Sequence, residues 1–131
     1  MNWEPIIRHL RERVACLLAI YAFGSRVSGD AGPKSDWDLA MLVEGKSDPV
    51  ELWNLAGEMA DIVGCPVDLL DLRVASTVMQ YQIITTGERL WTKDYQAALY
   101  ESFILSEKTA LDETRAPLMR IIKQEGTIYG R

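Results

Sequence analysis

The chain has 131 residues, of which 48% are hydrophobic and 25% are charged, and its formal net charge is −5. This length and composition predict a single globular domain with a substantial core. An acidic chain without clustered Lys and Arg lacks the basic surface that binds nucleic acid, and no apolar run is long enough to span a membrane. We therefore expect neither a nucleic-acid partner nor a membrane one.

The first predicted elements are a helix and an apolar strand. Pro5 suits a first helical turn, and Ile6, Leu10 and Val14 recur at helical spacing. The run from Leu17 to Phe23 is apolar at every position, which favours a central strand covered on both faces.

The two cysteines lie in or beside apolar runs and have no metal-ligand spacing. Cys16 and Cys65 are therefore predicted to be buried free thiols in a reducing compartment. Residues 1–13 carry charges throughout and do not resemble a signal peptide. The expected location is the cytoplasm.

A Gly-Ser pair follows the first strand directly. Gly24 has no Cβ, so the backbone there can approach a phosphate closely and take a positive φ. Ser25 offers a hydroxyl and a backbone N–H to phosphate oxygens, and Arg26 is one of the nearest cations. A Gly-Ser pair alone is most often a simple turn, and a solvated loop position explains Arg26 equally well.

Two aspartates begin the second apolar run, which is predicted to form a strand from Asp36 to Val43. Asp36 and Asp38 alternate along it, so both side chains project from the same face. Neighbouring carboxylates repel each other unless a cation lies between them, and Mg²⁺ binds a few carboxylates together with substrate phosphates. An isolated Asp-x-Asp is most often a solvated strand end. Together with the preceding Gly-Ser, the pair predicts metal-assisted phosphate chemistry.

The next predicted elements are a helix and a third strand. Asp48 and Pro49 begin a predicted helix that ends at Gly64. The strand from Pro66 to Leu72 then follows.

This third strand contains two aspartates that face opposite sides of the sheet, so only one of them can join the first pair. Asp68 lies within the apolar run, where a buried carboxylate would be costly without a nearby cation. Asp71 lies at the strand end, where capping a helix is the simpler role. We therefore predict that Asp68 is the third acid, with Asp71 as the alternative.

The remaining residues predict more helix and one short strand. Val74–Thr86 is predicted to be a helix and Arg89–Thr92 an edge strand. Asp94 caps a helix from Tyr95 to about Thr114, which Pro117 must break or restart. Several apolar and aromatic residues of this segment could dock a partner or simply cover the sheet: Tyr95, Tyr100, Phe103 and Ile104.

The spacing Gly24-Ser25, ten residues, Asp36-x-Asp38 resembles the signature of the DNA polymerase β-like nucleotidyltransferases. The string GSRVSGDAGPKSDWDLAMLV resembles their minimal nucleotidyltransferase (MNT) branch. One departure is Val27-Ser28-Gly29, where the family often has a small residue and then Arg-Gly. The resemblance covers about residues 4–92 and matches no motif in the helical segment at about 94–126.

The resemblance implies one nucleotidyltransferase domain over residues 1–131, of the α/β (α+β) class. We expect a small mixed sheet with helices packed mainly on one side. It also implies that Gly24 and Ser25 hold the triphosphate of ATP, with Arg26 as a further candidate. Catalysis would depend on Mg²⁺ bound by three acids: Asp36, Asp38 and Asp68.

Many members of this branch are antitoxins encoded beside a HEPN-domain RNase toxin. The resemblance therefore implies an antitoxin that transfers AMP from ATP to a tyrosine hydroxyl of such a toxin and forms a hetero-oligomer with it. Two alternatives remain open: a small-molecule nucleotidyltransferase of the aminoglycoside-modifying type, and an antitoxin that only binds.

Overall fold

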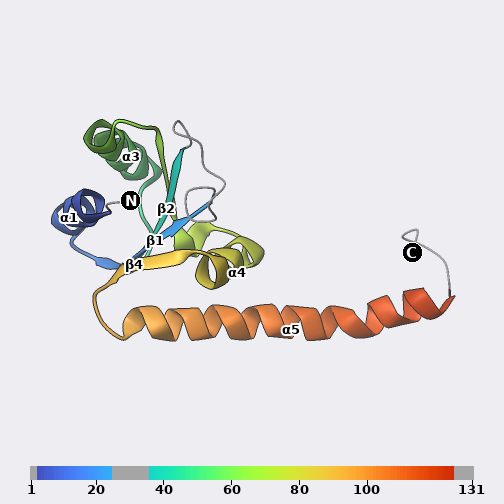
Figure 1. Cartoon of the computed structure of the whole chain (residues 1–131). Helices are drawn as coiled ribbons and strands as arrows, with labels where there is room; N and C mark the ends of the chain where they lie inside the picture. The colour runs from blue at the N-terminus through green and yellow to red at the C-terminus, as the bar shows by residue number, and fades with distance from the viewer. Residues whose placement is uncertain (1–2, 25–35, 126–131) are drawn as a thin grey trace.

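The computed structural model describes the backbone of residues 3–24 and 36–125 and the side chains of residues 3–24 and 36–110 (Figure 1). The elements are, in order, α1 (Glu4–Arg13), β1 (Leu17–Phe23), β2 (Trp37–Val43), α3 (Pro49–Val63), β3 (Val67–Asp71), the 3₁₀ helix η1 (Leu72–Val74), α4 (Thr77–Thr86), β4 (Glu88–Thr92) and α5 (Gln96–Glu125). The predicted mixed α/β class is confirmed.

The described strands form one four-stranded sheet in the order β3-β2-β1-β4. The strand β1 is apolar throughout and takes a central place, paired antiparallel with both β2 and β4. The strand β3 pairs parallel with β2 and lies at the edge. Phe23 is paired with Asp38, and Asp38 with Asp68. The end of β1 and the starts of β2 and β3 therefore meet at one end of the sheet.

Helices cover both faces of the sheet, so the expectation that they pack mainly on one side is wrong. One core cluster joins a sheet face to α1 and α3, and a second joins the opposite face to α4 and the start of α5 (Figure 1). The physical reason is the composition of the central strands. Successive side chains point to opposite faces, and nearly every residue of β1 and β2 is apolar, so both faces need cover.

Side chains and glycine set the ends of the helices. The Asp48 carboxylate accepts a hydrogen bond from the Val50 N–H at 3.1 Å, and Pro49 is the first residue of α3. Gly64 ends that helix with φ 74°, in the left-handed region. Both ends agree with the predictions from the sequence.

Two helices differ from their predicted extents. The expected helix from Val74 divides into η1 and α4 because the Ser76 hydroxyl accepts from the Met79 N–H and starts a new helix. The predicted break at Pro117 is wrong, since α5 is continuous from Gln96 to Glu125. Proline removes one backbone donor, and a single lost hydrogen bond does not end a 30-residue helix.

The helix α5 is fixed to the sheet near its start and extends well beyond the core (Figure 1). The buried Tyr21 hydroxyl donates to Glu101 Oε2 at 2.7 Å, and Arg89 donates to the same oxygen at 2.9 Å. Ile104 is buried against the core, whereas Phe103 is 56% exposed. Within the described residues, no helix is both long and apolar enough to cross a membrane.

The cysteines and the apolar side chains of α5 differ in part from expectation. Cys16 is exposed rather than buried, and neither it nor Cys65 forms a disulfide. Of the side chains considered for docking, Tyr95 and Phe103 are exposed, while Tyr100 packs against the core. A docking role for α5 therefore stays a prediction, and Tyr95 and Phe103 are the named side chains left open for it.

Candidate functional site

Gly24 and Asp38 lie in close contact at the end of the sheet where β1 ends and β2 begins. Gly24 has φ 82°, a conformation that other residues rarely adopt. A Cβ at this position would overlap Asp38 Oδ2 and lie 3.0 Å from Asp38 Cγ. The absence of a side chain at Gly24 therefore makes room for the Asp38 carboxylate.

Three predicted acids converge beside this contact. Asp38 and Asp68 are direct partners in the parallel register of β2 and β3, and Asp36 is two residues before Asp38. Trp37 and Leu39 belong to the core on the α1 and α3 side, so the alternation of β2 turns Asp38 toward the α4 side. Burial, then the charges of Asp68 and Asp36, raise the pKa of the Asp38 carboxyl above its usual range. This concentration of negative charge favours a bound cation.

The choice of Asp68 over Asp71 stays a prediction, and the reason given for it does not hold in the structure. Asp68 is exposed near the start of the edge strand β3, so the cost of burying its charge does not apply. Asp71 is the buried acid, 2% exposed, and it accepts hydrogen bonds from the backbone N–H groups of Ser47 at 2.8 Å and Arg73 at 3.0 Å. Its predicted capping role is confirmed at η1.

The two acids should therefore respond differently to the same substitution. Asp71→Asn should destabilise the fold by about 1–3 kcal/mol, because the amide nitrogen cannot accept from one of the two buried N–H groups. Asp68→Asn should leave the free energy of unfolding nearly unchanged, since its side chain is exposed. Urea denaturation of both variants measures the difference. Equal losses would contradict the distinct positions of these side chains.

Two predicted phosphate ligands, Ser25 and Arg26, lie outside the described residues. Gly24 is the last described residue before them. Among the described side chains, those of residues 3–24 and 36–110, no three His, Cys, Asp or Glu are arranged as a ready-made metal cluster. The charges of Asp68 and Asp36 both act on the Asp38 carboxyl.

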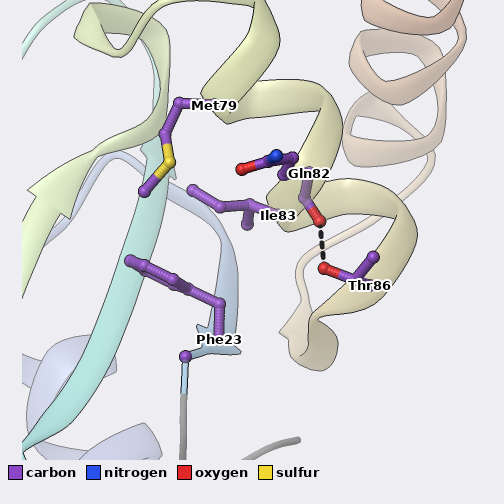
Figure 2. A pocket seen from close by; sticks show the side chains of 6 residues that line it. Phe23, Met79, Gln82, Ile83 and Thr86 are labelled. Atoms are coloured by element: carbon purple, nitrogen blue, oxygen red, sulfur yellow. Dashed lines mark hydrogen bonds between the residues drawn. The ribbon is translucent and has the colours of Figure 1, made fainter.

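A pocket of about 300 Å³ adjoins the acids on the α4 side (Figure 2). It is lined by residues from the end of β1 and from one face of α4: Phe23, Gly24, Met79, Gln82, Ile83 and Thr86. Gly24 thus borders both the pocket and the Asp38 carboxylate. Sequence reasoning missed these α4 residues. The sequence of α4 gave no distinctive signal, since Gln82 is one of several polar residues interspersed among apolar ones.

Comparisons with known proteins agree with this geometry. The family described as "Polymerase beta, Nucleotidyltransferase" matches residues 4–96. The chain is 41% identical over 91 residues to protein adenylyltransferase MntA of Shewanella oneidensis. The match covers 70% of this chain and 66% of that relative, slightly less than two thirds of its length.

Two solved structures contain chains of similar fold. One, a toxin–antitoxin crystal structure with AMP-PNP, matches with a TM-score of 0.81 and 33% identity, covering 94% of this chain and 99% of the other. The other holds the tri-AMPylated HEPN toxin of Shewanella oneidensis in complex with an MNT antitoxin. It matches with a TM-score of 0.73 and 32% identity, covering 92% and 94% of the two chains.

Proposed function

We propose, from the premise that this chain belongs to the polymerase β nucleotidyltransferase family, that it transfers AMP from ATP to a tyrosine hydroxyl of a HEPN-domain toxin and so neutralises that toxin. The observation that carries the proposal is that Gly24, Asp38 and Asp68 lie together at one end of the sheet. A site of this kind combines close backbone approach with concentrated negative charge. Phosphoryl chemistry with a cation needs both.

The similar proteins support the nucleotide and the partner. The curated relative is a protein adenylyltransferase, and one matched structure contains an ATP analogue. Another contains a HEPN toxin that already carries AMP groups. We infer the same substrate pair for this chain, with the toxin and the antitoxin forming a hetero-oligomer.

The proposed reaction joins the acceptor oxygen to the α-phosphorus of ATP. The bond from that phosphorus to the bridging oxygen breaks, pyrophosphate leaves, and the proton of the hydroxyl passes to solvent. Gly24 and Ser25 hold the β- and γ-phosphates, with Arg26 as an additional cation, and this keeps the α-phosphorus beside Asp38. Asp68 is exposed at the edge strand, so an acceptor hydroxyl can reach it from solvent.

The donors present fit Mg²⁺, which binds proteins through one or two carboxylates and completes its shell with substrate phosphates and water. Because Mg²⁺ takes part of its coordination shell from the substrate and water, an enclosed metal cluster is not needed among the described side chains. Asp36, Asp38 and Asp68 would hold the ion. When bound, it supplies charge neutralisation on the triphosphate and lowers the pKa of the attacking hydroxyl.

Tyrosine is the preferred acceptor on chemical grounds. The phenol has a pKa of about 10, so it gives up its proton more readily than an aliphatic hydroxyl does. A protein acceptor also brings its own binding surface. This matters because segment 94–126 offers little more than one helix, α5, to hold a small substrate.

Intact-mass spectrometry tests the proposal. The chain, ATP and Mg²⁺ are incubated with its proposed HEPN-domain partner, and we expect this HEPN protein to gain the mass of one or more AMP groups. A HEPN protein with its tyrosines changed to phenylalanine is the control and should remain unmodified.

The two alternatives predict other outcomes. An unmodified HEPN protein, with AMP found instead on an aminoglycoside, would indicate a small-molecule enzyme. An unmodified HEPN protein that binds tightly and loses its RNase activity would indicate an antitoxin that only binds. Either result would overturn the proposed reaction.

A further inference from the structure

The strand β3 pairs on one side only. Within the described residues its backbone bonds to β2 alone. The Trp37 N–H donates to the Pro66 carbonyl at 3.0 Å, and successive residues of a strand direct their backbone groups to alternate sides. The N–H and C=O groups of Val67 and Leu69 therefore face away from β2. Such a row of outward donors and acceptors is a template for one more strand.

A hollow with a largely apolar lining lies against the same side of β3. Leu69 packs in the core on the α1 and α3 face and Leu70 in the core on the α4 face, yet both line this hollow. It must therefore open at the edge of the strand, where the two faces meet. Leu52 of α3 and Val74 of η1 also line it. Its volume, about 290 Å³, is below the usual range for small-molecule sites and suits one large apolar side chain.

The buried Asp71 fixes the surroundings of this hollow. Its carboxylate accepts hydrogen bonds from the backbone N–H groups of Ser47 at 2.8 Å and Arg73 at 3.0 Å. The Arg73 Nε–H in turn donates to the Val43 carbonyl at 2.8 Å. These bonds tie the turn before α3 and the start of η1 to the sheet. The hollow is thus formed before a partner arrives, which lowers the entropy lost on binding.

The same strand carries one of the acids of the proposed active site. Asp68 and Leu70 are two residues apart on the α4 face, so they are separated by about 7 Å along the strand. An extended segment paired along β3 has the same spacing. One of its side chains can enter the hollow at the level of Leu70 while another, two positions away, lies beside Asp68.

We propose that the outer side of β3 binds the acceptor segment of the HEPN-domain toxin as an additional strand, with a large apolar side chain in the hollow and the acceptor tyrosine beside Asp68. The inference rests on the proposed function, which requires a protein hydroxyl to reach the acids. A polypeptide is the occupant that can use both features: its backbone matches the outward groups of Val67 and Leu69, and its side chain fills the hollow. The pairing then holds the tyrosine at a fixed distance along the strand.

The backbone pairing is tested with Val67→Pro. Val67 is the first residue of β3 and its N–H faces away from β2, so proline removes one outward donor and keeps the bonds within the sheet. We expect the Kd of the HEPN protein, measured by calorimetry without nucleotide, to rise about tenfold, because a carbonyl of the bound segment loses its partner. Val67→Ala keeps the N–H and should bind like the wild type. Urea denaturation checks that both variants fold.

The hollow is tested with Val74→Gln. This side chain is 63% exposed, so the substitution should leave the fold intact while placing a polar group in the apolar lining. We expect the KM for the HEPN protein to rise about tenfold, with kcat and the Kd of Mg-ATP unchanged. Val78→Gln is the matched control, since Val78 is 48% exposed and lies outside the lining. It should change none of these constants.

The outcomes separate this inference from the proposed function. Unchanged Kd and KM in Val67→Pro and Val74→Gln, with AMP still transferred, would overturn the docking site and leave the transfer standing. Weaker HEPN binding in these variants, with no AMP adduct formed by the wild type, would support binding along β3 and overturn the transfer. A wild-type dimer that Val74→Gln dissociates, with unchanged HEPN affinity, would assign the edge to a second copy of the chain instead. If Val67→Pro does not fold, the result for Val74→Gln decides.

Discussion

Replacing Asp38 with asparagine should lower the rate of AMP transfer by at least about a thousandfold. A carboxylate that holds a catalytic cation contributes several kcal/mol of transition-state stabilisation, and each 1.36 kcal/mol is about tenfold in rate. Asp36→Asn should show a smaller loss, because Asp36 is exposed and lies just before β2. Single-turnover transfer to the HEPN protein, followed by intact mass, measures both.

The same substitution should stabilise the protein at neutral pH without Mg²⁺. Burial and the charges of Asp68 and Asp36 raise the pKa of Asp38 above the ordinary value of 3.8, so its ionised form is disfavoured in the folded state. Wild-type stability therefore falls as pH rises from 3.8 through the raised pKa, and the loss persists above it. Asp38→Asn removes that loss. Its advantage should disappear as pH falls toward 3.8.

The combination of lower activity and higher stability is the diagnostic result. Asp61→Asn, an exposed position on α3 remote from the sheet edge, is the matched control and should change neither quantity. Saturating Mg²⁺ should stabilise the wild type more than Asp38→Asn, because a ligand stabilises the form that binds it. A variant that transfers AMP at the wild-type rate would remove Asp38 from the metal site.

The strands and the acid pair were predictable from sequence because local patterns determine them. The run Leu17–Phe23 is apolar at each position, and the observed strand has the same bounds. Asp36 and Asp38 are separated by one residue, which fixes their common side on any strand. The antiparallel pairing of consecutive strands, a frequent arrangement, then brings the predicted site residues Gly24 and Asp38 together.

The exposure of Asp68, the predicted third acid, was not predictable, because it depends on strand order and packing. A single sequence does not reveal that β3 lies at the edge with Asp68 exposed. Nor does it reveal that the backbone N–H groups of Ser47 and Arg73 enclose Asp71 at the other end of the strand. The pocket was not predicted from the sequence for the same reason. Phe23 and Gln82 are far apart in sequence, and the packing of α4 against the sheet brings them together.

Gly24→Ala should lower the rate of AMP transfer by about a hundredfold. Two effects act at this position, and they can be separated. The left-handed backbone, with φ 82°, costs an ordinary residue about 1–2 kcal/mol of folding stability. The new methyl group would also overlap Asp38 Oδ2, so the carboxylate must move, and a displacement of about 1 Å in a catalytic site can cost a hundredfold in rate.

Gly45→Ala is the matched control for the backbone effect. Gly45 has nearly the same φ, 79°, but a Cβ there would meet nothing within 4 Å. This variant should lose a similar amount of stability through backbone strain and keep full activity. The difference in rate between the two variants then measures the contact with Asp38.

A double variant completes the test. If Gly24→Ala acts through the Asp38 carboxylate, adding it to Asp38→Asn should lower the rate little further, since the group it displaces has already lost its charge. Multiplicative losses would mean that Gly24 acts separately from Asp38, through direct contact with the triphosphate. Equal activity of the Gly24→Ala and Gly45→Ala variants would show that the close approach of Gly24 to Asp38 does not matter for transfer.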